Sequence, residues 1–137
     1  MKKLLALSLI TLCLMSLATA KSQEQFYTGL IVDARELGIN PSKSPKIYDL
    51  AGKEIYGTLD IDPDYVIKVG IVQYENTIGD AIRHETAGVN PIVVRAAKKG
   101  EHPSKADVII SVDDGNWIRH ANEKTYFLDL LKVVFVI

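Results

Sequence analysis

The sequence contains a single cysteine, Cys13, and it lies inside an apolar run over residues 4–17. The residues that follow this run have no thiol. They therefore cannot form a disulfide, a thiolate nucleophile or a zinc–thiolate centre. A domain built from them depends on its hydrophobic core for stability.

Net charge is also small. Removing Lys2 and Lys3 from the 16 basic residues leaves 14 against 17 acidic ones, a net charge of −3 for residues 21–137. A nearly neutral domain of this kind argues against nucleic acid or an anionic membrane surface as its main partner.

The first twenty residues have the pattern of a secretory signal peptide. Lys2 and Lys3 precede the apolar run, and Ala18-Thr19-Ala20 places small residues where a signal peptidase reads. The run is shorter than the roughly 20 apolar residues of a membrane span. Cys13 lies within it rather than at the cleavage site, so lipid attachment is not expected. We predict cleavage after Ala20, a periplasmic location and no direct membrane span.

Residues 21–137 predict one domain without a linker or an internal repeat. Apolar and β-branched runs favour strands over residues 26–34, 71–74, 91–97, 106–111 and 132–137. Residues 46–57 (KIYDLAGKEIYG) predict a β-hairpin, with Gly52 closing its turn and Tyr48 opposite Tyr56.

Three helical segments are predicted. Asp62 caps a short helix over residues 63–69, with Pro63 at its first position. A helical turn is expected over residues 80–85. A longer helix begins after Asp113 or Asp114 and reaches residue 128, and its predicted packed side comprises Trp117, Ile118, Ala121 and Tyr126.

These elements predict an α+β fold, with one mixed sheet that includes the hairpin and with two or three helices covering one side of it. The chain ends on the apolar strand KVVFVI. Such a strand, exposed at a sheet edge, would promote aggregation. We therefore expect it inside the sheet or paired with another subunit.

Tests for catalytic motifs give no match. His84-Glu85 would need a second histidine at position 88 to form a zinc-protease helix, and that position holds Gly88. Residues 60–64 alternate carboxylates, but Tyr65 stands where a calcium loop needs glycine. No serine lies in a G-x-S-x-G elbow, and no glycine-rich phosphate loop is present. We expect no enzyme, no catalytic or metal-binding residue and no cofactor.

The predicted contact residues lie at the end of the first predicted strand and in the loop that follows it. Asp33 and Arg35 end that strand and share a face, as a salt bridge or as a ligand-gripping pair. The loop over residues 37–46 follows them. With Asn40, Lys43 and Lys46, these two residues form the predicted ligand or partner contact set.

Residues 28–57 (TGLIVDARELGINPSKSPKIYDLAGKEIYG) resemble the C-terminal region of flagellum-associated outer-membrane lipoproteins of the FlgP and LPP type. The stretches NPIVVRAA, ADVIIS and KVVFVI continue the likeness in the same order. The chain departs from those relatives in having no lipobox and no additional N-terminal region. The resemblance implies a non-enzymatic role in the periplasm, linked to motility or envelope structures.

We therefore expect an exported interaction module of the bacterial envelope. Its partners would be envelope or flagellar proteins, or a second copy of the chain, and partners would hold it at the outer membrane. Contacts would come from surface strands and the loop over residues 37–46. Two alternatives stay open: a periplasmic small-ligand-binding protein, and a metal-dependent hydrolase that uses His84 and His120.

Overall fold

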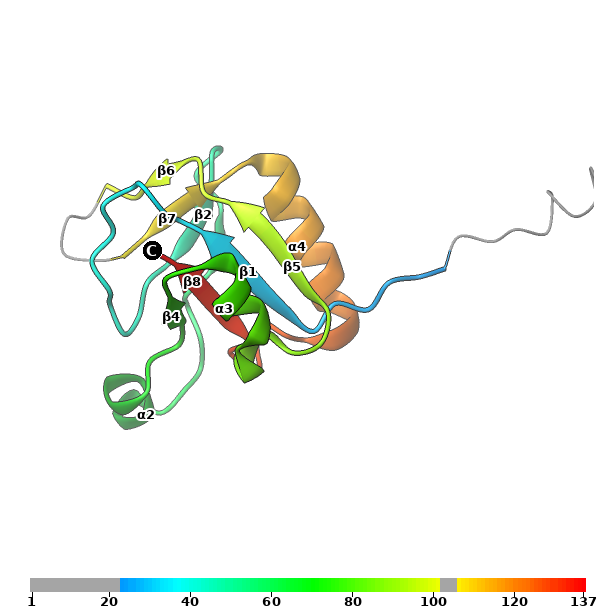
Figure 1. Ribbon diagram of the computed structural model, residues 1–137, viewed down its shortest axis with the longest axis horizontal. Helices are drawn as coiled ribbons and strands as arrows, with labels where there is room; N and C mark the ends of the chain where they lie inside the picture. The colour runs from blue at the N-terminus through cyan, green and yellow to red at the C-terminus, as the bar shows by residue number, and fades with distance from the viewer. Residues whose placement is uncertain (1–22, 102–105) are drawn as a thin grey trace, which may run out of the picture.

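The computed structural model describes residues 23–101 and 106–137. The predicted signal peptide and its cleavage after Ala20 lie outside these residues. Within them the chain forms one small α+β domain, which confirms the predicted fold class (Figure 1). The elements follow in the order β1 (Gly29–Asp33), β2 (Ile47–Asp49), β3 (Glu54–Tyr56), α2 (Pro63–Lys68), β4 (Gln73–Glu75), α3 (Ile78–Arg83), the 3₁₀ helix η1 (Glu85–Ala87), β5 (Pro91–Arg95), β6 (Lys98–Lys99), β7 (Val108–Ile110), α4 (Val112–Thr125) and β8 (Val133–Val136).

The described strands form two sheets, where the sequence predicted one. The first is fully parallel, with the order β4-β8-β1-β5, and the second is mixed, with the order β3-β2-β7-β6. The predicted strand over residues 91–97 bends between them. The Ala96 amide donates to the carbonyl of Asp33 in the first sheet, and the Ala97 amide donates to the carbonyl of Ile109 in the second. One continuous segment therefore belongs to both sheets.

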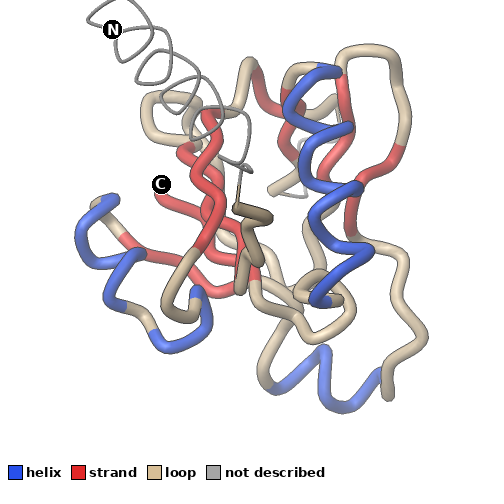
Figure 2. Tube along the Cα trace, turned by 90° about the vertical axis from the view of Figure 1, so that its right-hand side faces the viewer, coloured by secondary structure: helices blue, strands red, loops and turns tan. Residues whose placement is uncertain are grey.

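The parallel sheet is buried on both faces. Leu30 and Val32 of β1 point into the main core, which also receives Ile118 and Ala121 of α4. Ile31 points to the other side and packs with Ala81 of α3. Figure 2 shows α3 and α4 on opposite sides of the parallel sheet, so the prediction that helices cover one side only is wrong. The apolar β1 and β8 sequences fit this environment, because strands buried on both faces carry near-continuous apolar runs.

The C-terminal strand lies inside the parallel sheet. β8 is hydrogen-bonded to β4 on one side and to β1 on the other, and all four of its residues are buried. Of the two alternatives that the sequence left open for KVVFVI, the structure shows the internal one. Because both edges of β8 are paired, it is not available to a second subunit.

The predicted hairpin is confirmed, with a different pairing. One carboxylate oxygen of Asp49 accepts from the amides of Ala51 and Lys53, and Gly52 has a φ of 87°. A register shift after Ile47 sets Tyr48 opposite Glu54 and Ile47 opposite Tyr56. The predicted pair of Tyr48 with Tyr56 is therefore wrong.

The helix boundaries show which capping signals dominate. Asp62 caps α2 as predicted, through a bond from the Asp64 amide. Ser111 caps α4 instead of Asp113 or Asp114, because its hydroxyl accepts from the Asp114 amide. The helix therefore begins two or three residues earlier than predicted. The two aspartates lie in the first turn, where negative charge favours the helix.

The packed side of α4 is narrower than predicted. Ile118 and Ala121 are buried, but Trp117 and Tyr126 are exposed. Tyr126 has a φ of 56° and ends the helix, so it does not continue the buried face. Trp117 lies at the surface with its ring edge-on to Tyr27, at a centroid distance of 5.5 Å.

We predict that Gly29→Ala lowers the free energy of unfolding by about 2 kcal/mol, because η1 crosses directly over β1 at this residue. An added Cβ would lie 2.9 Å from the Ala87 carbonyl carbon and closer still to its oxygen. Urea unfolding measures the loss. Gly79→Ala is the matched control, since its Cβ meets only the flexible end of Arg83. A Gly29→Ala protein as stable as the control would contradict the close contact.

Candidate interaction surface

Asp33 and Arg35, two of the predicted contact residues, bind each other. The Arg35 guanidinium donates twice, to both carboxylate oxygens of Asp33, each at 2.9 Å. The Arg35 amide also donates to Asp33. The pair therefore anchors the start of the loop after β1, and the guanidinium fork is occupied. The hydrogen bond from Arg35 lowers the pKa of Asp33 below its ordinary value.

The other three predicted residues do not contact this pair, and each has different surroundings. Asn40 is exposed in the loop. The ammonium of Lys43 donates to the Lys68 carbonyl at the end of α2, at 3.4 Å. The ammonium of Lys46 is paired with Glu54 at 2.7 Å and also reaches the Thr58 hydroxyl. These contacts do not converge on a common cleft.

We predict that Arg35→Gln raises the pKa of Asp33 toward 3.8, its ordinary value. Because the folded pKa is depressed, the pair contributes stability above the unfolded pKa and loses it as the pH falls through the folded value. The variant should therefore lose less stability than the parent between about pH 4 and pH 2. An NMR titration of the Asp33 carboxyl measures the shift. Arg83→Gln, which unpairs Asp80, is the control and should leave Asp33 unchanged.

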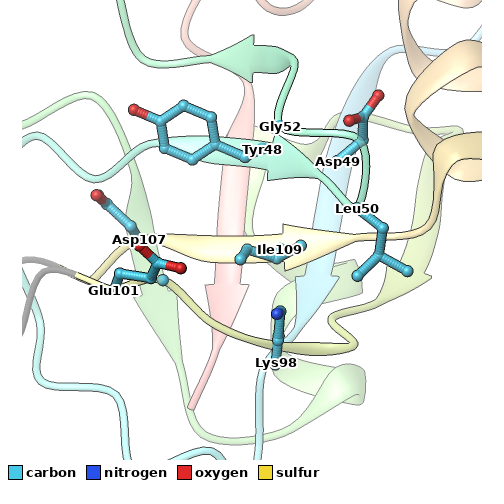
Figure 3. A pocket seen from close by; sticks show the side chains of 9 residues that line it. Tyr48, Asp49, Leu50, Gly52, Lys98, Glu101, Asp107 and Ile109 are labelled. Atoms are coloured by element: carbon cyan, nitrogen blue, oxygen red, sulfur yellow. The ribbon is translucent and has the colours of Figure 1, made fainter.

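A cleft of about 310 Å³ lies on the outer face of the mixed sheet (Figure 3). Ile109 of β7 is central to it, between Tyr48 on one side and Lys98 on the other. The carboxylates of Asp107 and Glu101 lie together at one end. Asp107 is buried, and one of its oxygens accepts from the Lys46 amide at 2.7 Å. That bond gives Asp107 a structural role in joining β7 to the start of the hairpin.

Helix α2 is largely exposed to solvent. None of its residues is buried, and it projects at the lower edge of the molecule (Figures 1 and 2). Val66 alone in the helix is partly buried against the core. The exposed fractions of the apolar side chains here are 44% for Tyr65, 70% for Ile67 and 42% for Val69. A six-residue helix of this composition does not hold itself in water.

Hydrogen bonds just beyond α2 hold it in place. The Ile71 amide donates to the Lys43 carbonyl at 2.8 Å, and the Tyr56 hydroxyl donates to the Ile71 carbonyl at 2.7 Å. Burial raises the pKa of Tyr56, and the charge of Asp129 adds to the effect, so the phenol keeps its proton. The backbone after α2 is therefore fixed to the core, and Val66 packs the helix against it, although no residue of the helix is fully buried.

We predict that Tyr56→Phe lowers the free energy of unfolding by about 1 kcal/mol, because the change removes a buried hydrogen bond without altering shape. Chemical denaturation measures it. Tyr65→Phe is the control, since that side chain is exposed and should be neutral. Equal stability of the two variants would show that the Tyr56 bond is not needed to hold this segment.

The turn after α4 supplies the surface opposite α2. The Leu131 amide donates to the Leu128 carbonyl and the Lys132 amide to the Phe127 carbonyl, the double closure that ordinarily has glycine at its left-handed position. That position holds Leu131, with a φ of 59°. A leucine there costs about 1 kcal/mol of backbone strain. In return its side chain packs against the core and leaves Leu130 61% exposed at the tip.

A shallow groove of about 440 Å³, widely open to solvent, runs between α2 and this turn. We call it the α2 groove; its lining residues are Ile61, Asp62, Tyr65, Asp129, Leu130 and Leu131. Its lining is four apolar or aromatic side chains and two carboxylates. An adjoining cleft shares Tyr65, Leu130 and Leu131 and continues past His84 to Lys132.

The two histidines of the hydrolase alternative lie in different elements. His84 caps η1, and its Nδ1 accepts from the Thr86 amide at 3.1 Å. His120 lies on α4 and faces Glu123 at 3.6 Å, the helical spacing predicted from the sequence. Among residues 23–101 and 106–137, no group of three or more metal-ligating side chains is close enough to hold an ion.

Residues 29–137 match the sequence profile of the second domain of Tp0624 from Treponema pallidum. The chain belongs to this family. The Tp0624 second-domain family match covers both sheets and all the residues of the α2 groove. No curated protein matches the chain. The resemblance to flagellum-associated lipoproteins is a separate inference from the sequence, and the Tp0624 family match does not bear on it.

No helix in the described part of the chain has the length and apolar character needed to cross a membrane.

The sequence predicted helix α2 correctly but did not identify the exposed apolar surface that α2 carries. The available signal was a short helix with Tyr65, Ile67 and Val69 at alternate positions, more apolar residues than so small a helix can bury. The opposite wall of the groove, at Leu130, lies 65 residues after Tyr65 in the sequence, so only the folded chain brings the two together.

Proposed function

We propose that this protein is a non-enzymatic interaction module of the bacterial envelope, exported to the periplasm, that binds a protein of an outer-membrane or flagellar assembly. The observation that carries the proposal is the α2 groove, where Tyr65 stays 44% exposed and Leu130 61% exposed beside a well-packed core. Exposed apolar patches framed by polar residues mark protein interaction sites. The signal-peptide pattern supports export, and the resemblance of residues 28–57 supports a link to flagellar or outer-membrane structures.

Binding of a partner at the α2 groove would be favoured by burial of apolar surface. A partner that covers Tyr65 and Leu130 removes apolar area from water, at about 25 cal/mol per Å². The groove is already formed, because Tyr56, Lys43 and Leu131 hold its walls from behind. Little ordering cost remains for binding. Such a surface suits a stable contact within a protein assembly.

In-cell cross-linking tests this proposal. We expect a photo-reactive residue in place of Leu130 to capture a specific envelope or flagellar protein, identified by affinity purification and mass spectrometry. The same residue in place of Val112 is the matched control, since Val112 is also partly exposed but lies at the start of α4, away from the groove. Absence of any neighbour specific to the Leu130 position would overturn the proposal.

The cleft of Figure 3 favours a second candidate function, the binding of a small ligand. It offers a phenol from Tyr48, an ammonium from Lys98 and the apolar side chain of Ile109 within one concave surface. A thermal-shift screen of metabolites distinguishes the two candidates, because ligand binding to the folded state raises the unfolding temperature. A rise in the unfolding temperature that is lost in the Ile109→Lys variant would favour the binding of a small ligand over the protein interaction.

A further inference from the structure

The α2 groove carries a negative charge on each wall. Asp62 begins α2 on one wall, and Asp129 lies in the turn on the other. Lysine, arginine and histidine are absent from the described residues that line it. We infer that the groove binds a peptide segment with bulky apolar side chains flanked by lysine or arginine. This inference rests on the proposed function and specifies the chemistry of the partner.

Both carboxylates are held in position before any partner arrives. One oxygen of Asp62 accepts from the Asp64 amide at 3.0 Å as the helix cap. One oxygen of Asp129 accepts from the Asn122 side-chain amide at 3.2 Å. Among the described residues, the second oxygen of each has no hydrogen-bond partner. Two fixed acceptors on opposite walls match two cationic side chains on either side of an apolar residue.

The floor between the carboxylates is apolar. Ile61 and Leu131 are partly buried against the core, and Tyr65 and Leu130 stand above them. A bulky apolar side chain of the partner would cover these four residues. Asp60 and Asp64, both exposed, add negative charge at the same end of α2. Complementary charge of this kind sets orientation and association rate.

Charge also differs along the surface. The adjoining cleft, past Tyr65, includes one carboxylate, Glu85, together with the ammonium of Lys132, and Lys68 lies in the last turn of α2. The basic residues of the partner therefore belong beside Asp62 and Asp129 and not in the adjoining cleft. An anionic membrane surface is disfavoured as the occupant, because its headgroups would meet Asp62 and Asp129.

Fluorescence anisotropy with two defined peptides tests the inference. Both carry fluorescein and a central Leu-Trp-Leu segment; one has two arginines on each side and the other two glutamates. We expect the arginine-flanked peptide to bind the purified protein more tightly than the glutamate-flanked one. Its affinity should fall as salt is raised.

Three variants locate the binding. Asp62→Asn combined with Asp129→Asn should weaken the arginine-flanked peptide about fivefold. Asparagine caps a helix as well as aspartate does, so the fold is retained. Asp113→Asn combined with Glu123→Gln is the matched control, which removes two exposed charges from α4 and should leave affinity unchanged. Leu130→Gln should weaken both peptides by a similar factor.

Three results would overturn the inference: no binding of the arginine-flanked peptide below about 1 mM, equal binding of both peptides, or equal effects of the two double variants.

The cross-link at Leu130 separates failure of this inference from failure of the proposed function. A neighbour captured with the same yield when Asp62 and Asp129 are both asparagine leaves the interaction function intact and removes the charge rule. Capture of no neighbour by either protein removes both.

Discussion

Burial of β1 and β8 on both faces is the constraint on which the rest of the structure depends. These strands form the centre of the parallel sheet, with every residue of β8 and nearly every residue of β1 buried. Each face then needs its own cover. Helices α3 and η1 cover one face, and the mixed sheet with α4 covers the other. Gly29 reflects the same demand, because η1 lies so close to β1 that no side chain fits between them.

Much of this arrangement could be predicted from local sequence. The hairpin, the Asp62 cap, the C-terminal strand and the α+β class depend on turn chemistry and apolar periodicity, which operate over a few residues. The division into two sheets could not be predicted in that way. It depends on a bend at Ala96-Ala97, where two small residues permit a change of partner and no turn residue marks the place. Register within the hairpin also escaped prediction, because a bulge follows Ile47 without a glycine to signal it.

The candidate surface was harder to predict than the fold. The sequence drew attention to Asp33 and Arg35, whose charges satisfy each other, and to Lys46, which pairs with Glu54. Charged residues at loop starts are often used in this way, since partners two to eight residues away are close at hand. The α2 groove joins residues 61–65 to residues 129–131. The groove is apolar because the fold leaves these side chains exposed, and which side chains stay exposed depends on the whole fold and not on any short motif.

The segment shared by both sheets has a consequence for how the domain opens. Separating the sheets would break the bonds that Ala96 and Ala97 make in opposite directions, and would expose the common core between them. A partly unfolded state that keeps only one of the two sheets would therefore have a high free energy. The domain should therefore unfold as one cooperative unit, and the amide protons of these two alanines should exchange with solvent only when the whole fold opens.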